Sequence, residues 1–170
     1  MDKEMYYRVS NFGFIGIVLL WLSMAIFVSS CERGVFYDES QKIQDREWSM
    51  HKYYVFEVDF PDTIQTYDFY ITFRHSVDYS YRNMFFFLRT YYPDSTITRQ
   101  DTIECFLADD YGHWLGKDNG DLRDVKMRFA AGIKLPMQGK YKFEIRQASR
   151  DSILRDVADI GLCIATKDVR

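Results

Sequence analysis

One cysteine of this chain stands where a covalent modification is chemically feasible. Cys31 follows Ser29 and Ser30, two small residues that give a signal peptidase access to the backbone. Its thiol is suited to forming a thioether with a diacylglyceryl group, and cleavage before it would free its amino group for a further acyl chain. Two or three acyl chains on one residue anchor a protein stably, whereas one chain does so only marginally. The chemistry expected at Cys31 is therefore attachment to a membrane.

The residues that precede Cys31 favour the same interpretation. Positions 1–11 are polar and include basic residues, and a continuous apolar run over residues 12–28 follows. This is the order of a secretory signal peptide, and Val28–Cys31 resembles the bacterial lipobox. We therefore predict cleavage between Ser30 and Cys31 and lipidation of Cys31. The alternative is that residues 12–28 remain as an uncleaved, short membrane anchor. Both alternatives place residues 32–170 outside the cytoplasm.

The remaining polar residues form no recognisable catalytic pattern. The histidines do not lie at a metal-ligand spacing from a cysteine or from one another, and we expect surface or loop positions for all three: His51, His75 and His113. The sequence contains no G-x-S-x-G elbow and no phosphate-binding glycine loop. We therefore predict that the protein is not an enzyme, that it carries no cofactor and no metal, and that it has no small-molecule ligand.

Two groups of acidic residues have side chains of the kind that bind calcium or catalyse glycoside hydrolysis. Residues 118–121, with Asp124 beyond them, do not match the EF-hand spacing, and an Asn-Gly pair flanked by acids is typical of a turn. Asp109 and Asp110 are neighbours in a loop, whereas glycoside hydrolysis needs carboxylates on opposite sides of the bond. We expect both groups to belong to a structural loop over residues 109–124.

Cys105 and Cys163 remain once Cys31 is assigned to lipidation. An exported protein can join such a pair in a disulfide. However, Cys105 shares the parity of predicted core positions, while Cys163 falls opposite Leu162 and Ile164. We therefore favour two free thiols, both buried or one of them half-exposed, with a disulfide as the alternative.

Several aromatic residues fall in predicted loops and at strand ends: Tyr79, Tyr81, Tyr91, Tyr92, Tyr111 and Trp114. Exposed rings of this kind can stack on sugars or form the hot spots of a protein interface. The alternative is that they cap the ends of the domain. We favour capping over binding.

The composition describes one globular domain without a nucleic-acid partner. The 170 residues are 47% hydrophobic and 28% charged, with a formal net charge of −3 and no basic stripe. Aromatic residues reach 18%, which favours strands over helices. We assign residues 1–30 to a lipoprotein signal peptide, 31–50 to a lipidated tether that leads into the domain, and 51–170 to the domain itself.

A period-2 alternation of apolar and polar residues predicts strands through most of the mature chain. The expected strands are 53–60, 67–74, 84–91, 97–107, 126–135, 141–147 and 160–165. Residues 84–91 are apolar on both faces, which is typical of a central strand. Residues 149–157 are compatible with one short helical turn. The predicted fold is all-β, a single antiparallel β-sandwich of about seven to eight strands.

A series of short motifs follows in order along the mature chain. They are Val35–Asp38, Tyr67-x-Phe69-x-Ile71 leading to Arg74 and Asp78-Tyr79, Gly112–Gly116, Gly120-Asp121, Leu135-Pro136, Gly139–Tyr141, Phe143–Ile145, Gln147-Ala148, Arg150 and Asp159–Leu162. In their order and spacing they resemble the gliding motility lipoprotein GldH family of Bacteroidota. No single motif is diagnostic, but together they cover nearly the whole mature chain.

The resemblance implies a non-enzymatic lipoprotein anchored in the outer membrane through Cys31, working with other gliding or envelope proteins near the type IX secretion system. Glu32-Arg33 is not a clear export signal, so we favour the periplasmic face. The alternative is a carbohydrate-binding β-sandwich lipoprotein of the cell envelope, because fold alone does not decide function.

Five of the matched residues are candidates for a structural or interaction role: Trp114, Gly116, Asp121, Arg150 and Asp159. We expect Trp114 to plug one end of the sandwich. Gly116, together with Gly120 and Gly139, is expected in turns that need a positive φ. The three charged residues are expected in buried ion pairs or hydrogen bonds that fix loops.

Overall fold

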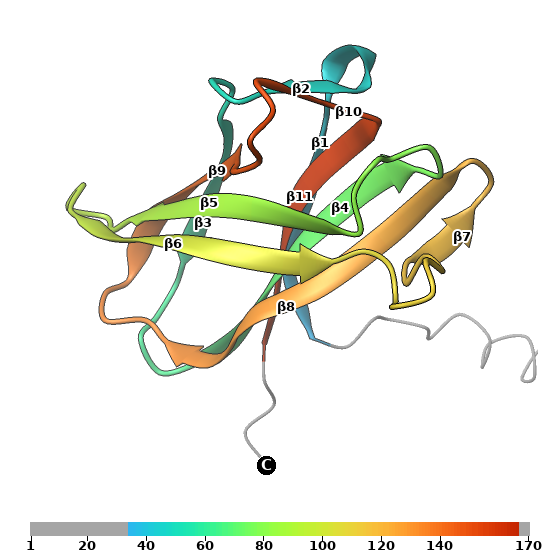
Figure 1. The fold of residues 1–170 in the computed structure, drawn as a ribbon. Helices are drawn as coiled ribbons and strands as arrows, with labels where there is room; N and C mark the ends of the chain where they lie inside the picture. Colours follow the sequence, from blue (N-terminus) through green and yellow to red (C-terminus); the bar gives the residue numbers. More distant parts are fainter. Residues whose placement is uncertain (1–33, 167–170) are drawn as a thin grey trace, which may run out of the picture. The chain divides into compact units, whose positions relative to one another are not determined.

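The computed structural model describes residues 34–166, which form an antiparallel β-sandwich (Figure 1). The all-β sandwich predicted from the period-2 alternation is thereby confirmed. The apolar run, Ser30 and Cys31 lie outside the described residues. Within residues 34–166, no helix is long and apolar enough to cross a membrane.

Eleven strands and one short 3-10 helix make up the described part of the chain. They are β1 (Val35–Lys42), η1 (Gln44–Arg46), β2 (Glu47–Ser49), β3 (Tyr54–Phe60), β4 (Thr66–Ser76), β5 (Asn83–Tyr91), β6 (Ile97–Phe106), β7 (Lys117–Asn119), β8 (Leu122–Lys134), β9 (Gly139–Gln147), β10 (Ile153–Arg155) and β11 (Val157–Thr166).

The count of seven to eight strands was too low, because four strands lack a readable alternation. β2, β7 and β10 have three residues each, which is too short for a period to show. The fourth, β1, is a mostly exposed edge strand. The helical turn expected within residues 149–157 is wrong: β10 pairs there with β2, through Leu154 opposite Trp48. Both side chains are buried, so tertiary contact decides the conformation of this segment.

The sandwich also begins earlier than the expected start at residue 51. β1 is an edge strand that pairs with β11 from Val35 opposite Ala165 to Lys42 opposite Asp159. Its residues are mostly exposed or half-exposed, as an edge strand at a sheet margin allows, so its sequence reads as a polar tether. Residues 35–49, expected to lead into the domain, are therefore part of it.

Within residues 34–166, two large sheets face each other across the core, and β10 and β2 form a separate two-stranded sheet. The larger sheet has the strand order β1-β11-β4-β8-β7, and the smaller one has the order β3-β9-β5-β6. β3 shows why the alternation works: Tyr54, Phe56, Val58 and Phe60 point inward and are buried, while the residues between them are exposed. β5 is bonded on both sides, to β6 and β9, as expected for an inner strand. Its Phe85 nevertheless faces outward and is exposed.

Aromatic rings fill much of the space between the sheets. Phe60 lies edge-on to Tyr67 at 4.9 Å and to Tyr141 at 5.2 Å between ring centroids, and stacks on Phe36 at 5.3 Å. Edge-to-face pairs of this kind add about 0.5–1.5 kcal/mol each to the gain from burial. Since Phe36 comes from β1, Phe60 from β3 and Tyr141 from β9, these contacts join the two sheets.

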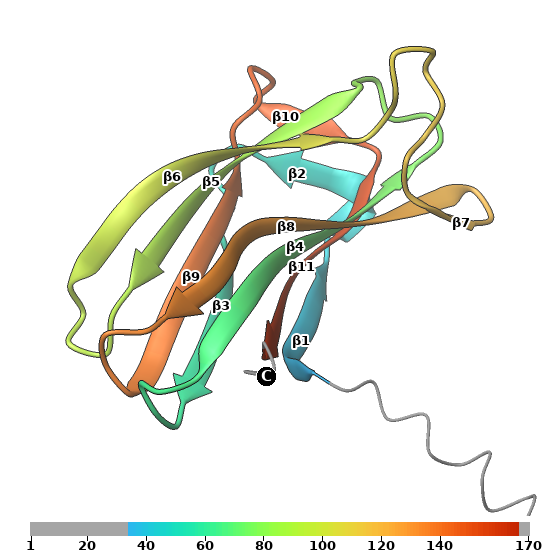
Figure 2. The same cartoon turned by 90° about the horizontal axis from the view of Figure 1, so that it is seen from below.

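One lateral side of the sandwich is closed and the other is open. On the closed side, β1 and β3 meet through the stack of Phe36 on Phe60 and through Gln41 Nε2, which donates to the Val55 carbonyl at 2.8 Å. On the other side run β6 and β8, and β7 accompanies only the first residues of β8 (Figure 2). A groove lies between β6 and β8 on this open side.

The two ends of the sandwich also differ. The near end is where β1 begins and β11 stops, with Val35 opposite Ala165 and the turns 61–65, 92–96 and 135–138. The far end holds the end of β4, the beginning of β8, β7, and the loops 77–82 and 107–116 (Figure 1).

Candidate interaction site

The five candidate residues gather at the far end, although they belong to different strands and loops. Asp159 lies near the start of β11, opposite Lys42 and Arg74. Trp114 and Gly116 lie in the loop before β7, Asp121 lies in the turn between β7 and β8, and Arg150 follows β9. The structure brings them to one end of the fold but not into one cluster.

A charged cluster crosses three strands on the outer face of the larger sheet. Arg74 of β4 donates through Nε to Asp124 of β8, and through Nη1 to Asp159 Oδ2 of β11 at 3.1 Å. Asn119 also donates to Asp124, at 3.3 Å. The guanidinium hydrogen bond holds the pKa of Asp124 below its usual range, and the same bond raises the pKa of Arg74. Asp159 is therefore one of the two acids that pair with Arg74.

This charged cluster borders a recess of about 360 Å³ on the outer face of the larger sheet. The other polar walls of the recess include Asp38, Lys117 and Lys126. Acidic and basic groups both line it, and the acids nearest Arg74 are already bonded to it. The recess is thus suited to polar contact with another protein.

Gly116 permits a close approach of chains and does not supply a positive φ. A Cβ at this position would lie 2.9 Å from the Asp124 carbonyl oxygen and 3.0 Å from Val125 Cγ2. The expectation of a positive φ is wrong for Gly116 but holds for Gly120 (φ 66°) and Gly139 (φ 118°). Gly116 therefore lets the loop before β7 lie against the strand that carries Asp124.

Trp114 lies against a buried histidine at the far end. Its ring is edge-on to His75 at 4.6 Å between centroids, and it is partly buried against the core. His75 is fully buried, with Nδ1 2.8 Å from the Ser76 carbonyl oxygen. Burial lowers the pKa of His75, so its ring is neutral near pH 7. The expected surface position is wrong for His75, and Trp114 is one of the residues that cover it.

The loop that carries Trp114 is organised by Asp109. Its carboxylate accepts the backbone N–H groups of Tyr111 at 2.9 Å and His113 at 2.8 Å, and these bonds, the His113 amide foremost, lower the pKa of Asp109. Ala108 and Trp114 form an isolated β-bridge across the loop. Asp110 points to solvent and pairs with Arg82 at 2.8 Å. The two neighbouring acids thus have separate structural roles.

Asp121 and Arg150 do not form the buried pairs expected of them. Asp121 makes an ion pair with Arg46 at 3.3 Å, but its side chain is 67% exposed. Its carbonyl oxygen accepts the Val77 amide at 2.9 Å, which ties the two far-end turns together. Arg150 is exposed and lines a hollow next to Asp151. Of the three charged candidates, only Asp159 has a largely buried side chain, which is 13% exposed.

The aromatic residues singled out from the sequence do not form one platform. Tyr79 is buried beside Tyr81, which donates to Asp151 at 2.6 Å at the far end. Tyr92 packs on Tyr141 at 5.6 Å near the opposite end. Tyr111 stands apart, with 88% of its surface exposed on the far-end loop. Tyr79, Tyr92 and Trp114 therefore pack on the core, whereas Tyr81 and Tyr111 are exposed.

Cys105 and Cys163 are both buried, and no disulfide joins them. They lie in different sheets, on β6 and β11. Burial raises the pKa of Cys105 to about 11 and also raises that of Cys163. Neither thiol is therefore an activated nucleophile. Among residues 34–166, no group of three or more histidine, cysteine and acidic side chains is arranged to hold a metal ion.

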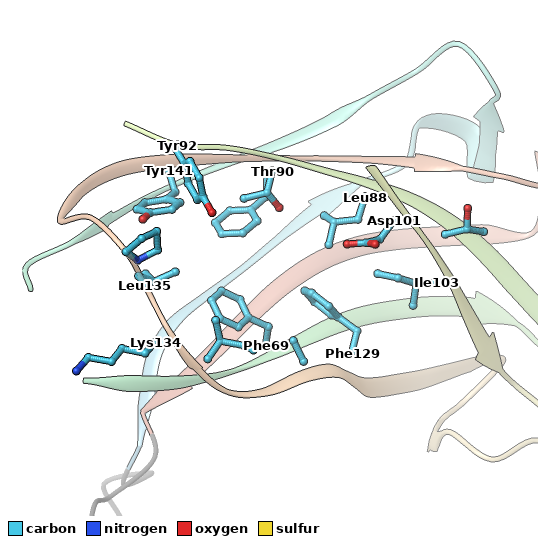
Figure 3. A pocket seen from close by; sticks show the side chains of 15 residues that line it. Phe69, Leu88, Thr90, Tyr92, Asp101, Ile103, Phe129, Lys134, Leu135 and Tyr141 are labelled. Carbon is cyan, nitrogen blue, oxygen red and sulfur yellow. The ribbon is translucent and has the colours of Figure 1, made fainter. Parts of the chain in front are cut away.

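The open-side groove is a pocket of about 470 Å³ between β6 and β8, lined by both apolar and polar side chains. Figure 3 shows the rings of Phe69 and Phe129 directed into it from the larger sheet, facing Leu88 and Thr90 of the smaller sheet. Its full lining is Phe69, Leu88, Thr90, Tyr92, Asp101, Thr102, Ile103, Phe129, Ala130, Ile133, Lys134, Leu135, Pro136, Tyr141 and Phe143.

Sequence reasoning missed this groove. A signal was present, because Asp101 shares the parity of Ile103 and Cys105 and so places an acid on the inner face of an edge strand. Inward-pointing charges on edge strands are a recognised guard against unwanted strand pairing.

Comparison with known proteins identifies close similarity in sequence. A protein-family model described as "GldH lipoprotein" matches residues 35–164. The "Gliding motility lipoprotein GldH homolog" of Christiangramia forsetii is 32% identical over 158 residues, covering 89% of this chain and 96% of that protein. The "Gliding motility lipoprotein GldH" of Flavobacterium johnsoniae is 28% identical over 168 residues, covering 95% and 99%.

Similarity to solved structures is weak. The structure of the infectious bursal disease virus Gx strain aligns with a TM-score of 0.32 and 14% identity, covering 78% of this chain and 32% of that chain. Dimeric latent PorU from Porphyromonas gingivalis aligns with a TM-score of 0.34 and 8% identity, covering 84% and 14%. This chain thus spans only a minor part of each.

Proposed function

The chain belongs to the GldH lipoprotein family, and from this premise we propose that it is a non-enzymatic component of a gliding-related envelope complex, anchored in the outer membrane and facing the periplasm. The observation that carries the proposal is the match of the folded domain, residues 35–164, to that family. Its curated relatives are named gliding motility lipoproteins. The proposed setting, near the type IX secretion system, comes from the family resemblance.

The early start of the sandwich gives the proposed anchor a geometric consequence. Three residues, Glu32 to Gly34, lie between Cys31 and the start of β1 at Val35. An extended chain spans at most about 3.6 Å per residue, so a lipid on Cys31 would hold Val35 within about 15 Å of the bilayer surface. The near end would then face the membrane, and the far end would be free for protein partners.

The far end has the chemistry of a protein contact surface. It carries the charged cluster of Arg74, Asp124 and Asp159 and the recess beside it. Fixed charges of both signs favour a specific orientation of a partner more than they add affinity. An interaction role fits this end better than catalysis does, since the buried thiols are not activated and His75 is enclosed.

The anchor is tested by metabolic labelling with an alkyne fatty acid in the native host. Wild-type chain is expected to incorporate the label and to sediment with outer membrane, and Cys31→Ala to lose both. Glu32→Ala, a change at the adjacent residue, is the control and keeps both. Digestion of intact cells with protease then distinguishes the two faces: a periplasmic domain stays protected. An unchanged label in Cys31→Ala, or cofractionation with the inner membrane, contradicts the proposal.

The interaction role is tested by purification of the native lipoprotein in mild detergent. A gliding or secretion protein is expected to co-purify with it, and Asp159→Asn is expected to weaken that association more than Lys140→Gln on β9 does. Recovery of the same partners at the same yield from both variants would count against a contact at the far end.

A carbohydrate-binding role is the second candidate, and one observation favours it. Tyr111 exposes 88% of its surface on the far-end loop, and an exposed ring of this kind is a platform for sugars. Trp114 is less suitable, because its ring packs on His75. Glycan-array binding that is lost in Tyr111→Ala would favour this candidate, whereas a complex that forms equally well without glycans would favour the first.

A further inference from the structure

The inner face of β8 is less well covered than the inner faces of its neighbours. Met127 and Phe129 of β8 pack against the core but are only partly buried, whereas the inward apolar residues of the adjacent β4 are buried. Ile103 of β6 is also only partly buried, although the inward apolar residues of the adjacent β5, Met84, Phe86 and Leu88, are buried. The missing cover lies on one side of the molecule, along the open-side groove.

Two strand edges flank this groove. β7 pairs with β8 only at Leu122, Arg123 and Asp124, so within residues 34–166 no strand pairs with the outer edge of β8 from Val125 to Lys134. β6 ends its sheet and pairs only with β5 in this described part. The edge of a β-strand presents backbone N–H and C=O groups that an extended peptide can pair with. Both requirements of strand addition, a free edge and apolar cover to complete, therefore occur together.

The charge along β8 indicates which strand would fit. β8 contains four basic residues and one acidic residue, although the whole chain carries a net charge of −3. Lys126 and Arg128 are exposed on its outer face, and Lys134 is exposed at its end. Side chains directly opposite each other on neighbouring strands interact, and opposite charges stabilise the pair. A strand beside β8 would therefore be favoured if its outward residues were acidic.

From these observations we propose that the open-side groove accepts an extended strand from a partner protein, which pairs with β8 and alternates apolar side chains with acidic ones. The apolar side chains enter the groove and cover Phe129 and Ile103. The acidic side chains lie on the outer face beside Lys126 and Arg128.

The same observations disfavour two other occupants. A second copy that added its β8 across a two-fold axis would place Lys126 and Arg128 against the same residues of its partner, and like charges opposite each other are destabilising. An acyl chain would fill the apolar space but would pair with no backbone group of β8.

The test uses the full chain in mild detergent and a fluorescently labelled nine-residue peptide that alternates valine and glutamate. Fluorescence anisotropy is expected to show that this peptide binds at least tenfold more tightly than either of two control peptides. One control has the same composition with its valines and glutamates in separate blocks, and the other alternates valine and lysine. Hydrogen–deuterium exchange is expected to slow at residues 125–134 only with the first peptide.

Charge reversal provides the matched variants. Arg128→Glu with Lys134→Glu is expected to weaken the glutamate peptide at least tenfold and to strengthen the lysine peptide. Lys42→Glu with Lys140→Glu makes the same change in net charge away from the groove, and binding should stay as in the wild type. Ala130→Trp fills the groove and should also reduce binding. Thermal unfolding establishes that each variant is folded; if Ala130→Trp does not fold, the charge pair decides alone.

Three results would overturn the proposal. The first is equal affinity for the alternating and block peptides, or no binding of either. The second is a fluorescent fatty acid that occupies the groove and excludes the peptide without protecting the β8 amides. The third is sedimentation showing that the chain dimerises through β8. That the partner is an envelope protein rests on the proposed function. The peptide assay uses the purified chain alone, so a negative result in it can be distinguished from a negative result in the anchoring experiment.

Discussion

Replacing Arg74 with methionine removes the central charge of the far-end cluster and keeps most of the side-chain volume. In the wild type this guanidinium bonds Asp124 on one neighbouring strand and Asp159 on the other. Arg74→Met leaves two carboxylates without that partner, one of them only 13% exposed. The change therefore tests whether charge pairing across β8, β4 and β11 stabilises the larger sheet.

The expected loss lies between two known limits. Removing one partner of a fully buried ion pair costs about 3–5 kcal/mol, whereas exposed pairs are worth about 0–1 kcal/mol. Arg74 is 39% exposed and Asp124 is 33% exposed, so solvent screens part of the interaction. We expect a loss of about 2 kcal/mol, which for a domain of this size lowers the melting temperature by about 8 °C.

The pH dependence separates charge from packing. The pKa of Asp124 is lowered in the folded state, so its contribution to stability is complete above the unfolded pKa of about 3.9 and is lost as the pH falls through the lower folded value. The difference between wild type and Arg74→Met should therefore be largest at pH 6–7 and should narrow from pH 5 towards pH 2. Circular dichroism during heating, at each pH, measures it.

Arg82→Met is the control, because Arg82 pairs with the exposed Asp110 and its removal should leave the melting temperature unchanged. Our reasoning would be refuted by a difference between wild type and Arg74→Met that is the same at pH 7 and pH 2.5, because packing alone would then explain the loss.

Three further predictions concern buried positions. Gly161→Ala should lower the free energy of unfolding by about 3 kcal/mol, since its Cβ would lie 2.6 Å from the Glu39 carbonyl oxygen in the paired strand. Gly120→Ala, in open space at φ 66°, should lower it by about 1 kcal/mol. Equal losses of stability for the two variants in thermal unfolding would contradict this prediction. Cys105, whose pKa burial raises to about 11, should react with a thiol reagent only after unfolding, and labelling of the native chain within seconds would show that it is accessible. Burial lowers the pKa of His75 in the folded chain, so on acidification the unfolded chain takes up this proton first, and the free energy of unfolding should fall as the pH drops below about 6.5. His75→Gln should reduce the dependence of stability on pH in this range. An unchanged dependence would show that other groups cause it.

The strands with a regular alternation could be predicted from the sequence because their environment is regular. β3 and β9 each have one face against the core and one towards solvent, so burial repeats every second residue. β1 and β10 could not be predicted in this way. β1 is a largely exposed edge strand, and β10 is a three-residue strand held by the pairing of Leu154 with Trp48.

The candidate residues were located by their order along the chain, but their roles depended on neighbours far away in sequence. Asp159 is bonded by Arg74, 85 positions earlier, and Gly116 is required by the approach of a strand backbone. His75 resembles a surface histidine in the sequence, since its burial depends on Trp114 and the loop that carries it.

The sequence by itself determined the features that depend on local order: the signal-peptide pattern ending at Cys31, the alternation that makes an all-β chain, and the motifs that identify the family. Only the tertiary structure decided how the strands meet. It assigned β1 to the sandwich and placed Arg74 between Asp124 and Asp159, and within residues 34–166 it left most of one edge of β8 unpaired beside a groove. The physical reason is that hydrogen bonding between strands and the covering of a sheet face depend on segments that are distant in sequence. The local alternation of apolar and polar residues indicates only which side chains face the core.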